Sequence, residues 1–197
     1  MPKGQLTVTL ADKDGVWSNQ KTFALKGSAS SGPVTIELGA IKFKSQVNGN
    51  FKKVVALKEG ENTLVMSATS ETGATAEASL IVFCDSKRPV IAISELENGV
   101  ITLKDPYVFK GQVSDDNFDS LSINGNGVIV KNGAFEHKLL FHEKPQTIKI
   151  TARDKAGNEQ DLNFSAHTTK QAVAADAPTG ILADLRSWTT ANAKARL

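Results

Sequence analysis

The sequence predicts an all-β protein made of two tandem antiparallel β-sandwiches, followed by a C-terminal linker and a candidate short helix. Three observations carry this prediction. The apolar residues lie in short segments that are rich in β-branched side chains and separated by Gly, Asn, Asp and Ser. The same pattern occurs twice along the chain. After residue 167 the composition becomes alanine-rich and polar, and it no longer has the pattern of strands.

Six segments of the first half have the length and composition of β-strands. They are residues 6–10, 21–27, 34–38, 51–57, 62–69 and 75–83. In the fifth segment Leu64, Met66 and Ala68 occupy alternate positions, so their side chains face the same side of the strand. Segment 147–152 of the second half shows the same alternation. About seven short strands within some 80 residues are typical of an antiparallel β-sandwich.

The two halves of the chain match each other at one constant spacing. The matched pairs include Gly27 with Gly111, Phe51 with Phe135, Ala68 with Ala152 and Gly73 with Gly157. Each pair is 84 positions apart (111 − 27 for the first pair), and the alignment needs no gap. We therefore predict a first domain at residues 1–85, a second domain at 86–167, and a C-terminal segment at 168–197.

The C-terminal segment begins as a linker and then shows a helical pattern. Ile181, Leu185 and Trp188 recur at the spacing of one helix face, with Thr179 as a candidate N-cap. Two interpretations remain open for this pattern. Either an amphipathic helix docks on a partner or on another domain, or the segment is an unstructured lead into a further domain.

The turn residues explain why particular letters recur in both halves. Gly49 and Gly133 each follow an asparagine and supply the positive φ of a tight hairpin. Phe51 and Phe135 come two residues later, and we expect them to fill the core of each domain. Gly60 is expected to adopt, in a turn between the two sheets, a backbone conformation that would be strained for other residues. These recurring residues are therefore interpreted as requirements of folding.

Three motifs resemble bacterial immunoglobulin-like (Big-type) repeats of surface and secreted proteins. The run G-x-F-x-x-x-V-x-L-x-x-G-x-N-x-L-x-x-x-A spans Gly49 to Ala68. The second half adds ARDKAGN at 152–158, and CDSKRPVI at 84–91 is similar to the junction between such repeats. The resemblance covers residues 5–167. It implies two tandem immunoglobulin-like antiparallel β-sandwiches and indicates little about activity.

The overall charge and the cysteine content exclude some classes of protein. A net charge of +2 is too small to indicate a nucleic-acid-binding protein, and no apolar run is long enough to cross a membrane. The single cysteine, Cys84, excludes an intramolecular disulfide, and its alternation with Leu80 and Val82 predicts an inward, unreactive side chain. We expect the chain to be part of a longer exported protein in the cell envelope, at the surface or outside the cell.

No set of residues in the sequence predicts catalysis or an organic cofactor. The chain has none of the common metalloprotease, hydrolase, redox or phosphate-loop motifs. His137 and His142 are expected on one strand, where their spacing would place them on opposite faces. The Gly-rich stretch at 123–130 is interpreted as a turn between middle strands, because no helical pattern follows it. The protein is therefore predicted not to be an enzyme.

Acidic residues suggest a calcium site where the two domains meet. The candidate ligands are Asp12, Asp14, Asp85, Asp115, Asp116, Asp119 and Asp154, with Glu59 and Glu61 in a nearby turn. Calcium prefers oxygen ligands and would stiffen a joint between modules. The alternative is that these residues are solvated and were selected because Asp favours turns.

The leading functional prediction is a non-catalytic spacer, scaffold or adhesion segment of a larger bacterial cell-envelope or secreted protein. Its expected partners are other domains of the same protein, a surface protein or a glycan. A second prediction is an accessory module of a secreted polysaccharide-active enzyme, with Trp17, Phe43 and Phe118 as candidate sugar-stacking rings. A third is a virion surface or tail module. Lys42 and Lys44 are expected on a solvated edge strand that resists aggregation.

Overall fold

The computed structural model of the chain describes residues 5–169, and all its named elements are β-strands. The all-β prediction is therefore confirmed for this range. The helical pattern predicted around Ile181, Leu185 and Trp188 lies outside the described residues. No helix within residues 5–169 is long and apolar enough to cross a membrane.

The first domain is a sandwich of two sheets. The three-stranded sheet has the order β1 (Val8–Leu10), β3 (Thr22–Ala29), β6 (Asn50–Ala56). The five-stranded sheet has the order β2 (Val16–Ser18), β8 (Thr75–Cys84), β7 (Gly60–Ser70), β4 (Val34–Leu38), β5 (Ile41–Lys44). All strand pairs are antiparallel except β2 with β8, which is parallel. Strand β5 lies at the edge, as predicted for the strand that carries Lys42 and Lys44.

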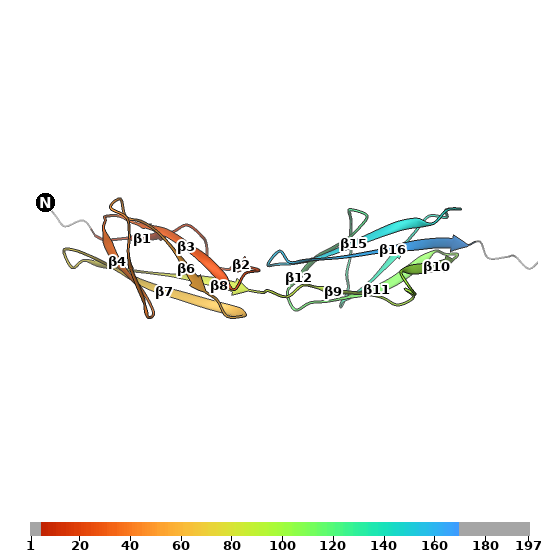
Figure 1. The fold of residues 1–197 in the computed structure, drawn as a ribbon, viewed down its shortest axis with the longest axis horizontal. Coiled ribbons are helices and arrows are strands. Elements are labelled where there is room, and N and C mark those ends of the chain that lie inside the picture. The colour runs from red at the N-terminus through yellow and green to blue at the C-terminus, as the bar shows by residue number, and fades with distance from the viewer. Residues whose placement is uncertain (1–4, 170–197) are drawn as a thin grey trace, which may run out of the picture.

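The second domain repeats this arrangement. Its three-stranded sheet has the order β14 (Ala134–Lys138), β11 (Val108–Ser114), β9 (Val90–Ile93). Its five-stranded sheet has the order β10 (Val100–Lys104), β16 (Glu159–Thr169), β15 (Gln146–Asp154), β12 (Phe118–Ile123), β13 (Asn126–Val128). The two sandwiches follow each other along one long axis (Figure 1). Among the described strands, no backbone pairing links one sandwich to the other.

Each domain buries its own core between its two sheets. In β7 the side chains of Met66 and Ala68 are buried and Leu64 packs against them, as their alternation predicts. In β15 the corresponding inward residues, Ile148 and Ile150, are fully buried. Period-two alternation therefore identified the inner faces of these strands correctly, because successive side chains of a strand point to opposite sides of the sheet.

A glycine–phenylalanine pair is repeated in the core of both domains. Gly27 lies directly opposite Phe51 across β3 and β6, and Gly111 lies opposite Phe135 across β11 and β14. A side chain at either glycine would collide with the phenylalanine ring of its partner. Both rings are buried, which confirms their predicted place in the core. The repeated glycines are thus required because each aromatic ring lies over the neighbouring strand.

The turn predictions are largely confirmed, and one strand prediction is wrong. Gly49, Gly60 and Gly133 all have positive φ. The stretch at 123–130 forms the turn between β12 and β13. His142, however, is not on the strand of His137, because β14 ends at Lys138. The backbone N–H and C=O of His142 instead exchange hydrogen bonds with the Thr168 hydroxyl, both at 2.8 Å.

Candidate functional site at the domain junction

The junction begins with a cysteine that closes the core of the first domain. Cys84 is the last residue of β8 and is buried, as its alternation with Leu80 and Val82 predicts. Its Sγ lies 3.5 Å from the backbone oxygen of Gln20. Burial raises the pKa of the Cys84 thiol, and the nearby charge of Glu59 adds to this effect. The thiol therefore stays protonated and unreactive at neutral pH.

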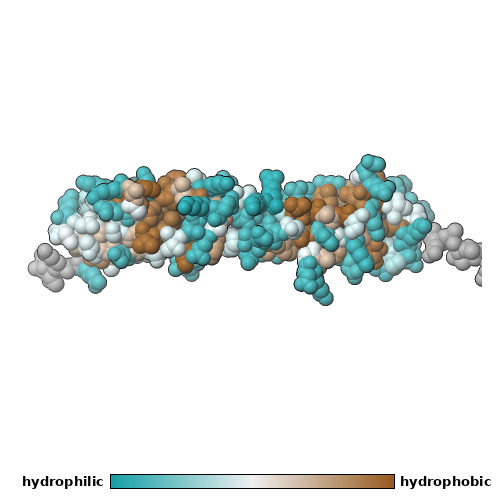
Figure 2. Space-filling view, turned by 90° about the horizontal axis from the view of Figure 1, so that it is seen from below, coloured by the Kyte–Doolittle hydropathy of each residue, from teal (hydrophilic) through white to brown (hydrophobic). Residues whose placement is uncertain are grey.

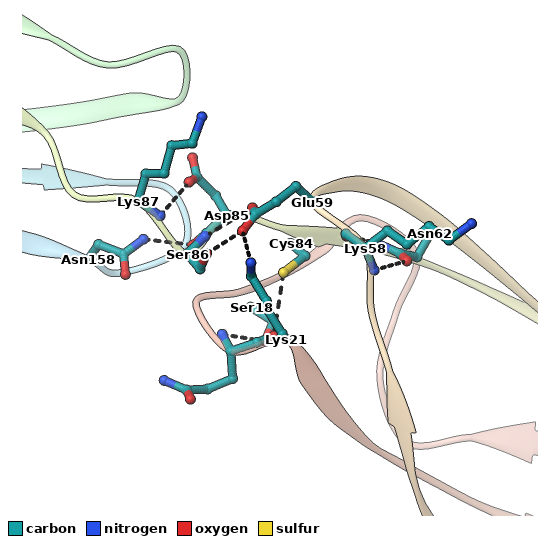
Figure 3. Close-up of polar contacts among 11 residues, drawn as sticks. Ser18, Lys21, Lys58, Glu59, Asn62, Cys84, Asp85, Ser86, Lys87 and Asn158 are labelled. Atoms are coloured by element: carbon teal, nitrogen blue, oxygen red, sulfur yellow. Dashed lines mark hydrogen bonds and ion pairs between the residues drawn. The ribbon is translucent and has the colours of Figure 1, made fainter.

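Asp85 ties the linker to both domains (Figure 3). Its backbone N–H donates to the Ser18 oxygen of the first domain at 3.0 Å. Its backbone oxygen accepts from Asn158 Nδ2 at 2.7 Å, and its Oδ2 accepts from Asn117 Nδ2 at 2.6 Å. The remaining oxygen, Oδ1, accepts from the Lys87 N–H at 3.0 Å. Only 7% of Asp85 is exposed, so these bonds replace contacts that water would otherwise make.

The two asparagines of the second domain are held in place by acids of their own turns. The N–H of Asn117 donates to Asp115 Oδ1 at 2.7 Å. The N–H and the Nδ2 of Asn158 donate to the two carboxylate oxygens of Asp154, at 2.8 and 2.7 Å. Each turn therefore presents a preoriented amide to the linker, which lowers the entropy lost when the domains dock.

A second contact anchors the linker to the first domain. Glu59 accepts hydrogen bonds from the N–H and the hydroxyl of Ser86 and lies 3.4 Å from Lys21 Nζ (Figure 3). The hydrogen bonds from Ser86 are the main reason that the pKa of Glu59 lies below its usual value, and Lys21 adds to the shift. The first domain thus holds the linker at Asp85 and Ser86, and the second domain holds it at Asp85.

An aromatic pair lies beside these hydrogen bonds. Trp17 in β2 stacks on Phe83 in β8, with ring centroids 4.9 Å apart. Lys155 of the second domain places its Nζ 5.7 Å from the centre of the Trp17 ring. This cation–π contact crosses the junction and adds a third link between the domains.

Three carboxylates converge at the junction. One oxygen from each of Asp85, Asp115 and Asp154 lies within 4.8 Å of the others, and Asp154 is 1% exposed. None of the four ion pairs found among residues 5–169 involves these three acids. Burial, followed by the charges of Asp85, Asp154 and Asp116, raises the pKa of Asp115. Like charges held this closely favour either a bound proton or a bound cation.

The other acids predicted as calcium ligands are not in this cluster. Asp14 accepts a hydrogen bond from the Ile81 N–H at 2.9 Å, three residues before Cys84, so its loop lies along the side of the first domain. The reason is the parallel pairing of β2 with β8, which brings Ser18, rather than the start of β2, to the level of Cys84. The expectation that Asp12 and Asp14 lie where the two domains meet is therefore wrong.

Two further predicted ligands are near the cluster but outside it. Asp116 is exposed, and its charge acts on Asp115. Asp119 is exposed on β12. Sequence patterns alone did not point to Asn117 and Asn158, although Asn117 directly follows Asp116 and Asn158 lies four residues after Asp154. The recurrence of Asx residues in the two turns was the available signal.

The histidines do not form a catalytic arrangement among the described residues. His137 packs against Phe109 in the second core, and burial lowers the pKa of its imidazole. His142 has its backbone tied to Thr168, and His167 lies in β16. Of the aromatic residues considered for sugar stacking, Phe43 and Phe118 pack against the cores, whereas Trp17 lies at the junction.

Comparisons with known proteins agree with this architecture. A family model described as glucodextranase, domain B, matches residues 89–171. The solved fibronectin(III)-like modules of CbhA from Clostridium thermocellum superpose with a TM-score of 0.50 at 13% identity, covering 83% of this chain and 94% of that one. Residues 5–169 have the fold of two tandem immunoglobulin-like β-sandwiches. The structural likeness supports the fold alone.

A curated relative extends the likeness across both domains. Bacillopeptidase F of Bacillus subtilis (strain 168) is 30% identical over an alignment of 162 residues, and the match covers 77% of this chain. The same stretch spans only 11% of the length of that relative. This tandem is thus similar to a small part of a much longer protein.

Proposed function

We propose that this tandem is a non-catalytic spacer in a longer exported bacterial enzyme, where it holds other domains of the same protein apart. The similarity to a short part of a bacillopeptidase and to a domain of a glucodextranase supports an accessory role beside a hydrolytic domain. Export fits a chain in which the only cysteine is buried and free. The adhesion and virion alternatives have no comparable support.

The observation that carries this proposal is the way in which Asp85 is held. A flexible linker would leave its polar groups in water, whereas Asp85 is buried and bonded to Ser18 of one domain and to Asn117 and Asn158 of the other. Side-chain and backbone bonds of this kind restrict the linker to one arrangement. A spacer needs this property, because its purpose is to keep a fixed separation.

A distance measurement between the two ends tests the proposal. Spin labels are placed at the exposed residues Val47 and Leu140, as Val47→Cys and Leu140→Cys in a Cys84→Ala background. Double electron–electron resonance between the two spin labels is expected to give a narrow distance distribution. Adding Asn117→Ala and Asn158→Ala is expected to broaden this distribution, because the hydrogen bonds from both side-chain amides to Asp85 are lost.

The matched control is Asn163→Ala on an exposed position of β16, away from the junction. This change is expected to leave the distribution narrow. A broad distribution in the unmodified pair would contradict the rigid-spacer proposal. Equal broadening in the control would show that asparagine removal acts through general loosening of the second domain.

We also propose that calcium binds at the junction and stiffens it, a role for which only part of the predicted ligand set comes together. Asp85, Asp115 and Asp154 supply three converging carboxylates, and calcium prefers about six to eight oxygen ligands. The Asp12 and Asp14 carboxylates do not contribute. The test is a thermal melt with calcium and with chelator, with magnesium as the control cation. Overlapping curves would contradict calcium binding and leave the spacer proposal intact.

A further inference from the structure

An apolar stripe crosses the outer face of the five-stranded sheet in the first domain. It consists of Val65, Ile81, Phe83 and Trp17. Strand register brings them together, because Trp17 pairs with Phe83, and Ile81 and Phe83 occupy alternate positions of β8. Val65 lies on the adjacent strand β7, diagonal to Ile81 through the Thr63–Ile81 and Val65–Ser79 pairs. Diagonal neighbours of this kind are within reach of large side chains.

The apolar stripe is not part of the hydrophobic core. In β8 the inward positions are taken by Leu80 and Val82, which are buried. The residues that alternate with them, Ile81 and Phe83, face outward and are only half-buried. Val65 is 57% exposed. Apolar side chains gathered on an outer sheet face cost solvation free energy, so they call for a reason other than folding.

The second domain shows that the fold does not require the apolar stripe. The positions equivalent to Val65, Ile81 and Phe83 hold Lys149, Ser165 and His167. Thr102 pairs with His167 where Trp17 pairs with Phe83. This face of the second domain is polar, and it carries the ion pairs Lys149–Asp161 and Arg153–Glu159.

The apolar stripe continues into a groove at the domain junction. Trp17 and Phe83 line this groove from the first domain, and its volume is about 480 Å³. Val90, Asp116 and Asn117 line it from the second domain. Ligand sites are often found between domains, in clefts of this size, with aromatic walls and a few polar groups. On the face shown in Figure 2, hydrophilic residues cover the middle of the molecule, where the domains meet.

The size of the apolar stripe favours a small ligand over a protein partner. A stable protein interface covers about 800 Å² on each partner, which four partly buried side chains do not provide. The neighbouring polar groups include the Thr63 and Ser79 hydroxyls on the sheet and the Asp116 carboxylate and Asn117 amide in the groove. A ligand that suits this surface has apolar faces and a rim of hydroxyl groups.

The charges around the apolar stripe favour a neutral ligand. Glu61 lies opposite Phe83, and Glu77 lies on the same outer face. Asp116 and Asp115 border the groove, with Lys87 and Arg88 on its linker side. Lys155, whose Nζ lies 5.7 Å from the centre of the Trp17 ring, adds a third cation. The acids would repel an acidic polymer at neutral pH, and the three cations offset part of the attraction for a cationic one.

We propose that the apolar stripe and the junction groove together bind a neutral oligosaccharide. The apolar faces of its rings pack on Phe83, Ile81 and Val65 and reach the Trp17 ring by displacing the exposed Lys155 ammonium from it, while its hydroxyls bond to groups such as Asp116 and Asn117. Binding at a surface shared by both domains would also hold the junction. This inference goes beyond the spacer proposal and does not depend on it.

Trp17 fluorescence provides a direct binding test. Trp17 and Trp188 are the only tryptophans in the chain, so a Trp188→Phe background isolates the emission of Trp17. The probes are neutral hexasaccharides of glucose, xylose and mannose in several linkages, with an acidic oligogalacturonate and an unrelated peptide for comparison. At least one neutral series is expected to shift the Trp17 emission saturably.

Variants then assign the binding to the apolar stripe. Val65→Lys and Ile81→Ser introduce residues that the second domain already has at the same sites, and each is expected to weaken binding about tenfold, or ~1.4 kcal/mol. Asp116→Ala is expected to weaken it without touching the apolar surface. Thr102→Ala in the second domain is the matched control and is expected to leave affinity within twofold. Thermal melts check that each variant is folded.

Three results would overturn the inference. The first is that no neutral oligosaccharide shifts the Trp17 emission. The second is that binding is unchanged by both Val65→Lys and Ile81→Ser in folded protein. The third is that the acidic sugar or the peptide binds through the apolar stripe in place of the neutral sugars. The end-to-end distance measurement stays a separate test of the spacer proposal.

Discussion

The two domains share their strand order and core but differ on the outer face of the larger sheet. Both have the glycine–phenylalanine pair in the smaller sheet, seen as Gly27 with Phe51 and Gly111 with Phe135. The outer face is apolar around Phe83 in the first domain and charged around Lys149 in the second. Residues that recur therefore report on folding, and residues that differ report on what each domain contacts.

The ends of the domains differ in the same way. The first domain ends in Asp85, which is bonded to the second domain, whereas the position 84 residues later is Thr169. The receiving turns of the second domain carry Asn117 and Asn158, while the equivalent positions in the first domain are Pro33 and Ala74. The junction is thus specific to this order of domains.

The largest expected effect comes from the shared core. Phe51→Ala and Phe135→Ala are each expected to cost ~3–5 kcal/mol in the domain concerned, because a buried ring is replaced by a cavity. Urea unfolding followed by domain-specific NMR signals measures this cost. The control is Val54→Ala, an exposed position on β6. Equal loss in both domains from one substitution would mean that the two fold as a single unit.

The next effect concerns the asymmetry of the domain ends. Asp85→Ala is expected to cost ~1–3 kcal/mol, because the Asn117 amide and the Lys87 N–H lose their buried acceptor. The comparison variant is Thr169→Ala, where only a 3.4 Å contact with the Leu103 oxygen is lost. Chemical denaturation is expected to show a loss for the first and almost none for the second. Similar losses would contradict a junction specific to Asp85.

A smaller effect depends on pH. The pKa of Asp115 is raised in the folded protein, so the folded state binds its proton more readily than the unfolded state. Stability from this group is therefore present at low pH and falls as pH rises from the ordinary Asp value through the raised one. In calcium-free buffer, Asp115→Asn is expected to raise the melting temperature at pH 7 and to have little effect at pH 3. Asp116→Asn is the neighbouring control, and a gain that persists at pH 3 would argue against this cause.

The smallest effect is expected on the polar outer face of the second domain. Hydrogen bonds from Lys149 and, to a lesser extent, Thr151 lower the pKa of Asp161. The stability that the ionised Asp161 contributes is therefore present at neutral pH and is lost as pH falls through the lowered pKa. Asp161→Asn removes the ion pair with Lys149 and is expected to reduce stability at pH 7. The loss is expected to be slight, because the side chains of Lys149 and Asp161 are exposed and solvent screens their charges. Thermal melts at pH 7 and pH 2 measure the difference. A large loss at pH 7 would show that this face is also structurally important.

Much of the fold was predictable because the relevant signals are local. Alternation in β7 identified Met66 and Ala68 as core residues, and the Asn–Gly sequence predicted the turn at Gly133. The candidate site was only partly predictable. The sequence indicated that Asp85, Asp115 and Asp154 would meet, but it also included Asp12 and Asp14, which lie elsewhere. A parallel pairing of β2 with β8, which local patterns do not reveal, decided that outcome.

The sequence by itself determined the two sandwiches and the glycine turns with positive φ, because strand alternation and backbone φ are properties of neighbouring residues. The need for glycine at Gly27 and Gly111 comes instead from the rings of Phe51 and Phe135 on the neighbouring strands. The tertiary structure decided which side chains meet across the junction. The Asn117–Asp85 and Asn158–Asp85 bonds join residues 32 and 73 positions apart. The apolar stripe likewise depends on the register of three strands, which places Trp17, Phe83 and Val65 on one face. Such contacts arise only from the packed arrangement of the whole chain.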